Sequence, residues 1–522
     1  MPGSTATGTV AVGTSGASGD VAYDPGPAQA PDVLVLLLDC VRADLLDAEL
    51  GSPGSLPYLS RLRSESVVFP AAVAPGSWTV PSHASLFTGL YPWDHGAHSR
   101  TGPLLTPGPE TIAECLGRAG YATALYSGNA YVQDATGLSR GFEETLWGGG
   151  REFFLRFLGL DRPSCPDLGS AGPVHVLPVE KEAPSRLRQF AIDSLSRAPA
   201  VWDALNRVGG KLLGTYGPTM RSVCPWIEPA IDAWLARQPA ERPVFLFVNL
   251  IEAHEPYLAD AGFEVGAGRW AGYARKRQDS VLWVRGDWKP TPSEVASSRR
   301  SYLRSLRTLD QRVERIVRTF AARRRWDRSL CFLTSDHGQA FLEQGTIYHR
   351  FRVDEPIARI PLWLRAPGRA VAGERPDAWV SLIDIPRTLA GLVGRETFGD
   401  PSTRSLLTDD PAALDRPVYA MTDGIRAAEI PAAAPEWKAF LDRLEVAVYR
   451  GGAKVVAHED GRTETFRVAV PDRGVAPEPL PGGPETAELE ELARRALELA
   501  QARIASQPYH GQVEHRIAGW GY

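Results

Sequence analysis

Apolar residues in this chain form short unbroken runs that alternate with longer amphipathic segments. Unbroken runs are typical of strands buried on both faces of a sheet, and a stripe with a 3.6-residue period is typical of the helices that cover it. The runs lie at residues 32–39, 121–126, 243–250 and 330–335, and the amphipathic segments lie at 57–65, 110–118 and 293–325. The alternation predicts an α/β fold with a doubly wound, mostly parallel sheet.

Three shorter segments add to this pattern. Residues 66–73 and 360–364 predict strands, and residues 381–392 predict a helix. Pro361 lacks a backbone N–H, so it indicates either the edge of the sheet or the start of a strand.

The hydrophobic pattern of the chain changes after about residue 400. Short strand-like runs follow one another with Gly-containing turns between them, a pattern that predicts antiparallel hairpins. These runs are residues 417–421, 444–449, 453–457 and 463–468, and an amphipathic helix is predicted at 485–505. We therefore expect a catalytic domain at 31–400 and a smaller C-terminal α+β subdomain at 401–522.

Two segments do not fit the regular pattern. Residues 1–30 are rich in Gly, Ala, Ser, Thr and Pro, which predicts a disordered tail and not a signal peptide. Residues 147–239 contain many Gly and Pro, which predicts an insertion with helical pieces at 186–195, 200–208 and 229–237.

Composition limits the possible partners and compartment. The net charge of −5 and pI of about 6.1 argue against nucleic acid as the main partner. No apolar run approaches the length of a membrane helix, so no membrane partner is expected. Five scattered cysteines without a Cys-x-x-Cys pair suit a reducing compartment, and we expect a cytoplasmic protein. The oligomeric state stays open.

Acids and histidines follow the predicted strands. Asp39 ends the first run, His254 follows the third, and Asp336 with His337 follows the fourth. Because the carboxyl ends of parallel strands meet at one edge of a sheet, these side chains are expected to lie together and to suit a divalent metal. Taken singly, each could be a helix cap or a core histidine.

The stretch at residues 74–96 contains a candidate nucleophile. Pro81 can open a helix that Gly89 ends, which would place the Thr79 hydroxyl beside a helix N-terminus, where anions are favoured. A hydroxyl there could attack a phosphate or sulfate ester. The alternative is that Thr79 is only the N-cap of the helix, and this window alone favours that role.

Six motifs in fixed order resemble the sulfatase branch of the alkaline phosphatase superfamily over about residues 32–394. They are LDCVRAD (38–44), TVPSHASLFTG (79–89), AHEPY (253–257), TSDHGQ (334–339), RIPL (359–362) and SLIDIPRTL (381–389). The resemblance implies an α/β three-layer sandwich around a large mixed, mostly parallel sheet. It also implies hydrolysis of small anionic esters with a divalent metal, which could be Zn, Mn, Ca or Mg.

The departures from the family pattern change the expected chemistry. Sulfatases have Cys or Ser, oxidised to formylglycine, at the position of Thr79, and Arg at the position of His83. The β-carbon of Thr already carries a methyl group, so Thr79 cannot become that aldehyde. Thr is the nucleophile of related phosphodiesterases and phosphoethanolamine transferases, which favours phosphorus over sulfur as the reacting centre.

Other site positions also differ from the family pattern. Cys40 stands where many sulfatases have a second metal-binding Asp, which thins the metal site or shifts it toward zinc. Asn129 and Tyr131 stand where sulfatases place a substrate-binding Lys and His. His349 lies near the position of a substrate-binding Lys or His.

Together these features predict a formylglycine-independent hydrolase of phosphate, phosphonate or sulfate esters. The expected metal ligands are Asp39, Asp336, His337 and Cys40, the catalytic group is Thr79, His254, His349 and His83, and the substrate-binding residues are Asn129 and Tyr131. A phospho- or sulfo-group transferase and a non-catalytic binding relative are the alternatives.

Overall fold

The computed structural model describes residues 30–147 apart from 103 and 130, then 227–255, 257, 289–424 apart from 369–371, 377 and 409, 443–470, and 477–507. The predicted N-terminal tail and the helices predicted at 186–195 and 200–208 lie outside the described residues. None of the helices within the described ranges is long and apolar enough to cross a membrane.

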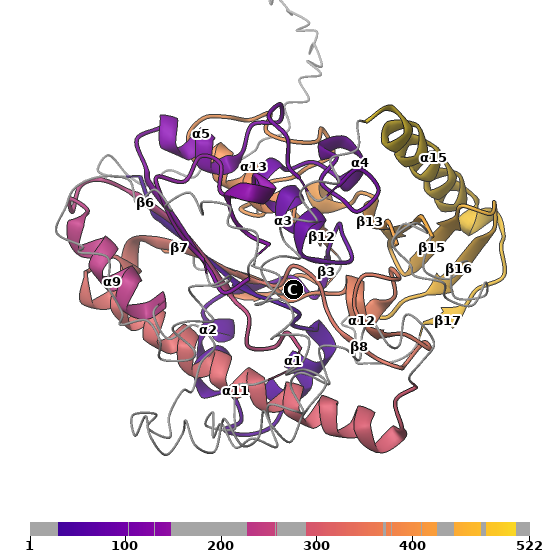
Figure 1. Ribbon diagram of the computed structural model, residues 1–522, viewed down its shortest axis with the longest axis horizontal. Helices are drawn as coiled ribbons and strands as arrows, with labels where there is room; N and C mark the ends of the chain where they lie inside the picture. Colours follow the sequence, from indigo (N-terminus) through magenta and orange to yellow (C-terminus); the bar gives the residue numbers. More distant parts are fainter. Residues whose placement is uncertain are drawn as a thin grey trace, which may run out of the picture.

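A mixed sheet of eight strands forms the centre of the molecule (Figure 1). Its strands, in spatial order, are β11 (Gly373–Glu374), β2 (Val67–Val68), β10 (Leu362–Arg365), β7 (Ser329–Thr334), β1 (Asp32–Leu38), β6 (Val244–Leu250), β4 (Ala122–Ser127) and β5 (Glu144–Trp147). The strands from β7 to β5 are mutually parallel, whereas β10 runs antiparallel to both of its neighbours. The predicted mixed, mostly parallel sheet is confirmed.

Helices cover both faces of this sheet. On one face lie α3 (Thr79–Thr88), α5 (Ile112–Arg118) and α13 (Asp384–Gly391), and on the other lie α1 (Ala43–Leu50), α2 (Pro57–Ser64), α9 (Ile227–Arg237) and α11 (Pro292–Ala322) (Figure 1). Strand β1 shows why both faces must be covered, because Val33 and Leu37 belong to one buried cluster and Leu34 and Leu36 to the other.

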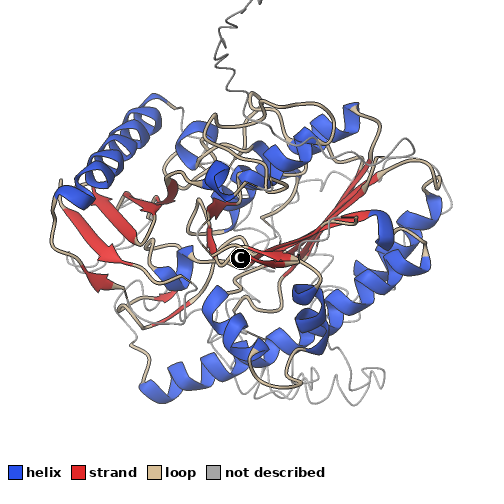
Figure 2. Ribbon diagram, turned by 180° about the vertical axis from the view of Figure 1, so that it is seen from behind, coloured by secondary structure: helices blue, strands red, loops and turns tan. Residues whose placement is uncertain are grey.

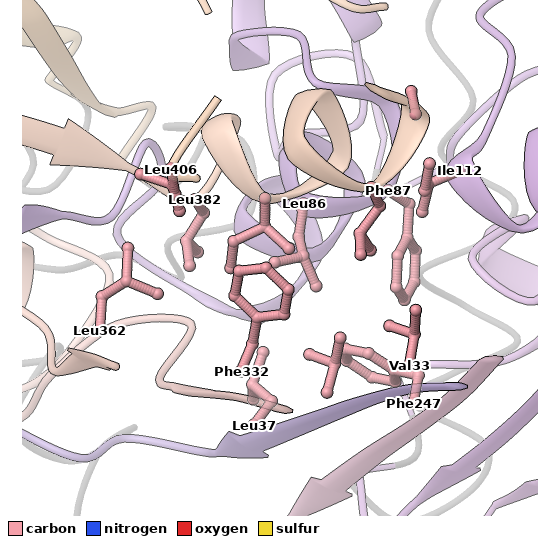
Figure 3. Close-up of a cluster of buried hydrophobic side chains, with 14 of the residues drawn as sticks. Val33, Leu37, Leu86, Phe87, Ile112, Phe247, Phe332, Leu362, Leu382 and Leu406 are labelled. Atoms are coloured by element: carbon pink, nitrogen blue, oxygen red, sulfur yellow. The ribbon is translucent and has the colours of Figure 1, made fainter. Parts of the chain in front are cut away.

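Helix α3 packs directly on the middle of the sheet. Leu86 and Phe87 point from α3 toward Val33 and Leu37 of β1 and Phe247 of β6 (Figure 3). This packing fixes the helix over the strands whose ends carry the candidate site.

A second, antiparallel sheet follows the main one in the chain and lies beside it (Figure 2). Its strands are β13 (Val418–Thr422), β14 (Glu445–Arg450), β15 (Ala453–His458), β16 (Thr463–Arg467) and β17 (Glu478–Pro479). Helix α15 (Pro484–Ser506) packs on it through a shared apolar cluster that includes Val446, Val455, Leu489 and Ala493. The hairpins and the terminal helix were predicted from the sequence.

Three local predictions need correction. The strand predicted at 66–73 breaks at Pro70, so that β2 joins the main sheet and β3 (Ala71–Val73) pairs with β12 (Trp379–Ser381). Because β12 takes residues up to Ser381, the helix predicted from that residue begins only at Asp384. Pro361 marks a strand start and not a sheet edge, since β10 lies between β2 and β7.

The remaining short elements lie in the connections between these helices and strands. They are the helices α4 (Pro92–His95) and α12 (Glu355–Ala358), the 3₁₀ turns at Asp134–Thr136, Trp326–Arg328 and Pro411–Leu414, and the hairpin of β8 (Ala340–Phe341) and β9 (Ile347–Tyr348).

Candidate active site

Thr79 is the first residue of helix α3 and is 3% exposed. The N-cap is Trp78, whose extended backbone (φ −160°, ψ 175°) precedes the helix. The alternative that Thr79 is only an N-cap is therefore wrong, and Pro81 is the third helical residue and not its opening one. Gly89 ends the helix in the left-handed region (φ 71°), as predicted.

The side-chain amide of Asn129 links the Thr79 hydroxyl to Asp39 at the end of the sheet. Asn129, which follows β4, donates from Nδ2 to Thr79 Oγ1 at 3.2 Å and to Asp39 Oδ2 at 2.9 Å. Asn249 of β6 also approaches Asp39 Oδ2 with its Nδ2, at 3.4 Å. The two asparagines thus orient a buried carboxylate and place a threonine hydroxyl beside it.

Asp336 and His337 follow β7, which pairs with β1 on the side opposite to β6. Asp336 Oδ1 accepts hydrogen bonds from the backbone N–H of Cys40 at 3.3 Å and of His337 at 3.0 Å. The Nδ1 of His337 lies 3.0 Å from the carbonyl oxygen of Gly338, so Nδ1 carries the proton and Nε2 presents a lone pair. That Nε2 lies 3.3 Å from Asp336 Oδ2.

These residues fit a divalent cation. The Oδ1 of Asp39, the Oδ2 of Asp336, the Nε2 of His337 and the Oδ1 of Asn249 are buried without a hydrogen-bond partner among the described residues. All four can donate a lone pair, and buried atoms of this kind are rarely left without a partner. One ligand atom from each of Asp39, Cys40 and His337 lies within 4.8 Å of every other, and a carboxylate oxygen, a sulfur and an imidazole nitrogen form a ligand set of intermediate hardness.

The charges of the group support the same interpretation. Burial and the charge of Asp336 raise the pKa of Asp39. Burial opposes the ionised form of Asp336, but His337 and its hydrogen bond hold the pKa of Asp336 down to about 2. Burial also opposes the imidazolium of His337, yet Asp336 and Asp39 raise its pKa to about 9. A bound cation would offset the repulsion between the two buried carboxylates, Asp39 and Asp336.

A second group of side chains lies beside the first. One ligand atom from each of Cys40, His254, Glu255 and His349 lies within 4.8 Å of every other. The ring of His349 stacks on His337 with centroids 4.4 Å apart and meets His254 edge to face at 5.1 Å. His254 and His349, predicted as catalytic residues, thus lie beside His337, and that catalytic role stays a prediction.

The pKa values of the two outer histidines shift in opposite directions. Burial opposes the charged form of His254, but Glu255 and Asp39 raise its pKa overall. Burial, together with His337 and His254, lowers the pKa of His349 well below its ordinary value. His254, whose pKa is raised, therefore lies beside His349, whose pKa is lowered.

Two further candidate residues take supporting positions. His83 lies one turn along α3, with Nδ1 2.9 Å from the Thr79 carbonyl oxygen and 3.6 Å from Asp336 Oδ2. Tyr131 donates its backbone N–H to Asn129 Oδ1 at 2.9 Å, and its ring meets Trp78 edge to face. Both residues thus contact neighbours of the Thr79 hydroxyl.

Three residues with a place in the site were not singled out from the sequence. Asn249 lies inside a strand, Glu255 follows His254, and Gln339 follows Gly338. Gln339 Nε2 donates to Glu255 Oε2 at 3.0 Å, while its Oε1 lies 3.0 Å from His349 Nδ1. The one available signal for Asn249 was a polar residue near the carboxyl end of the otherwise apolar run at 243–250.

The fold and the site together define a class of protein. A sulfatase family model matches residues 31–154 and 227–395, more than half of the chain. The chain belongs to the sulfatase family, in the alkaline-phosphatase-like superfamily that its motifs resemble.

Comparisons with individual proteins agree with this assignment. The chain is 27% identical to mouse (Mus musculus) steryl-sulfatase over 446 residues, which cover 73% of this chain and 65% of that protein. Phosphonate monoester hydrolases from Agrobacterium radiobacter and Silicibacter pomeroyi share the fold, with TM-scores of 0.60 and 0.59 and identities of 17% and 19%. The matches cover 91% and 92% of this chain and 96% of each hydrolase.

Proposed function

We propose that this protein is a metal-dependent hydrolase of phosphate, phosphonate or sulfate esters that uses Thr79 as its nucleophile. The observation that carries the proposal is the bridge made by Asn129 between the Thr79 hydroxyl (3.2 Å) and Asp39 (2.9 Å). It places a hydroxyl beside a buried set of lone pairs suited to a divalent cation. Membership of the sulfatase family supports ester hydrolysis as the reaction class.

Thr79 would open the reaction. Its Oγ1 attacks phosphorus or sulfur as the bond to the leaving-group oxygen breaks, and water later hydrolyses the resulting threonine ester. A divalent ion held by Asp39, Cys40, Asp336 and His337 would lower the pKa of a neighbouring hydroxyl and neutralise developing negative charge. The N-terminus of α3, at which Thr79 lies, favours the anionic ester group.

The histidines would complete the site. His254 and His349 lie where they can hold non-bridging oxygens or supply a proton to the leaving group. His83 and Asn129 would act as positioning residues, because they fix the backbone and the hydroxyl of Thr79.

Phosphorus is the favoured reacting element. Thr79 cannot form the aldehyde nucleophile of ordinary sulfatases, so the chemistry we propose is independent of formylglycine. Two of the structural neighbours are named phosphonate monoester hydrolases, which supports a phosphonate or phosphate ester as substrate.

The test compares two buried threonines of the same helix. Metal-loaded wild type, Thr79→Val and Thr88→Val are assayed with aryl phosphate, phosphodiester, phosphonate monoester and sulfate esters. We expect Thr79→Val to lower kcat by at least about 10³-fold, which corresponds to roughly 4 kcal/mol, while Thr79→Ser retains turnover. Thr88→Val removes a hydroxyl bonded within the helix, 2.7 Å from the Ala84 carbonyl, and should retain most of the activity.

Two results would contradict the proposal. One is turnover of a substrate that survives Thr79→Val unchanged. The other is that metal-loaded wild type hydrolyses none of the four ester classes, while wild type and Thr79→Val bind an inert ester analogue with equal affinity. That result would favour a non-catalytic relative.

A further inference from the structure

The segment that leads into Thr79 is fastened to the second, antiparallel sheet. Strand β13 runs alongside this segment, and Met421 donates its backbone N–H to the Pro75 carbonyl oxygen at 2.9 Å. The next residue of the strand, Thr422, has its hydroxyl 3.0 Å from Ser77 Oγ. Two consecutive residues of β13 thus hold the chain four and two positions before the candidate nucleophile.

The residue that follows β13, Asp423, holds the side chain directly before Thr79. Its Oδ1 accepts the indole Nε1–H of Trp78 at 3.2 Å. Trp78 is 4% exposed and Asp423 is 1% exposed, so this hydrogen bond is shielded from solvent. Because water cannot replace a buried partner, loss of the bond would leave a polar group unpaired.

The loop after α4 orients the carboxylate of Asp423. Its Oδ2 accepts the backbone N–H of Ser99, a residue that is itself fully buried. Ser99 Oγ in turn accepts a hydrogen bond from Nη2 of Arg350 at 2.6 Å. Ser99 is thus bonded to two side chains that both contact the Trp78 indole.

Arg350 covers the face of the same indole. Its guanidinium carbon lies 4.4 Å from the centre of the Trp78 ring, within the range of a cation–π contact. Its φ of 90° is one that residues with a side chain rarely adopt. Two bonds hold this backbone in place, since its N–H donates to the Ser77 carbonyl oxygen at 2.9 Å and its carbonyl accepts the Thr422 hydroxyl at 2.7 Å. Arg350 therefore ties together the same two segments that β13 and Asp423 connect.

Trp78 determines where the nucleophile lies because it is the N-cap of α3. Its extended backbone (φ −160°, ψ 175°) makes Thr79 the first helical residue. A shift of Trp78 would therefore move the Thr79 hydroxyl relative to Asn129, whose amide lies 3.2 Å away. A misplacement of about 1 Å at the reacting atoms can cost on the order of 10²-fold in rate.

We propose that Asp423 is a positioning residue for Thr79, which it holds through the indole of Trp78, and that Arg350 supports the same indole. The inference rests on the proposed function, because it takes Thr79 as the nucleophile. It gives the second sheet a role in turnover, since Asp423 directly follows one of its strands.

A second tryptophan provides a matched control. Trp379 of β12 is also 4% exposed, and its Nε1 donates to the Gly451 carbonyl oxygen in the β14–β15 turn at 2.6 Å. The guanidinium carbon of Arg359 lies 4.9 Å from its ring centre. Trp78→Phe and Trp379→Phe therefore each remove one indole hydrogen bond to the second sheet, but only Trp78 adjoins Thr79.

Steady-state kinetics of the metal-loaded variants separate positioning from stability. We expect Trp78→Phe to lower kcat about 10–100-fold with KM nearly unchanged, because the contacts to the bound ester remain. Trp379→Phe should lower Tm by a similar amount and keep the kcat of wild type. Asp423→Asn cannot accept from both Trp78 and Ser99, so it should also lower kcat. It should add little to the loss already caused by Trp78→Phe, because the indole through which it acts is then absent.

Hydrogen exchange of the metal-free protein gives a reading that does not depend on turnover. The peptide that spans residues 76–85 should exchange its amide hydrogens faster in Trp78→Phe than in wild type, because the first turn of α3 loses its anchor. In Trp379→Phe the same peptide should exchange as in wild type.

Equal kcat in Trp78→Phe and Trp379→Phe, with Thr79→Val inactive, would overturn this inference and leave the proposed function standing. Fully additive losses in the double variant of Trp78 and Asp423 would also overturn it, because Asp423 would then act by another route. If wild type turns over none of the esters, the proposed function fails and the exchange measurement decides the inference. Unchanged exchange at residues 76–85 in Trp78→Phe would then overturn it.

Discussion

Acid should loosen the segment that supports helix α3, through two buried histidines outside the catalytic group. His95 of α4 accepts the Ala97 N–H at Nδ1 (3.0 Å), so its Nε2–H donates to Ser85 Oγ of α3 (3.0 Å). Burial, reinforced by His98, lowers the pKa of His95 to about 3. Burial also lowers the pKa of His98 to about 4, although Asp423 opposes this shift.

The size of the effect follows from proton linkage. An unfolded histidine titrates near pH 6.5, so below that pH the unfolded chain binds protons that folded His95 and His98 do not bind. The free energy of unfolding therefore falls as pH falls from about 6.5 toward the folded pKa values, by about 1.4 kcal/mol per pH unit for each histidine. At pH 4.5 the two together would remove on the order of 5 kcal/mol, a large share of the 5–15 kcal/mol that is typical of a domain.

Urea unfolding followed by tryptophan fluorescence between pH 7 and 4.5 measures this loss. The matched variant is His95→Asn, whose Oδ1 can accept the Ala97 N–H but does not titrate. The free energy of unfolding of His95→Asn should fall less steeply with falling pH than that of wild type, by about 1.4 kcal/mol per pH unit. The contribution of the carboxylates is common to both proteins and cancels in this difference. Equal pH slopes for wild type and His95→Asn would refute the reasoning.

Two further substitutions test the packing and the chemistry of the site. Gly338→Ala should lower Tm strongly, because a methyl group there would lie 2.0 Å from the Pro356 carbonyl oxygen. The control is Gly452→Ala, whose methyl group meets no atom within 4 Å and should change Tm little. Similar Tm values for the two variants would show that the tight contact at Gly338 is not required. Asn129→Leu removes the donor to Thr79 and should lower kcat roughly 10–100-fold, the equivalent of about 1–3 kcal/mol, with folding retained. Unchanged kcat in Asn129→Leu would remove the bridge from the account.

The sequence was sufficient to predict the main layers and the strand-end ligands. Unbroken apolar runs at β1, β6 and β7 identified strands buried on both faces, and parallel order requires their carboxyl ends to share an edge. The sequence alone therefore predicts that Asp39 and Asp336 lie at the same edge of the sheet.

The parts that could not be predicted depend on register and loop geometry. Asn249 reaches the site because it pairs with Leu37 on one side and Ser127 on the other, a register that no local pattern specifies. The contact of His349 with Cys40 depends on the β8–β9 hairpin and on the left-handed backbone of Cys40. The sequence predicts that α3 begins at Pro81, but the helix begins at Thr79, because Pro is tolerated throughout the first turn and does not fix the first helical residue.

A trapped intermediate would test the central claim most directly. Metal-loaded protein is mixed with a fast aryl phosphate or phosphonate ester, quenched in acid within the first turnover, digested and examined by mass spectrometry. The account predicts one phosphoryl or phosphonyl group on the peptide that contains Thr79, with fragmentation placing it on that residue and Thr79→Val lacking it. Productive turnover with the group on Ser77 or Ser82, or with an unmodified Thr79 peptide at every quench time, would contradict the account.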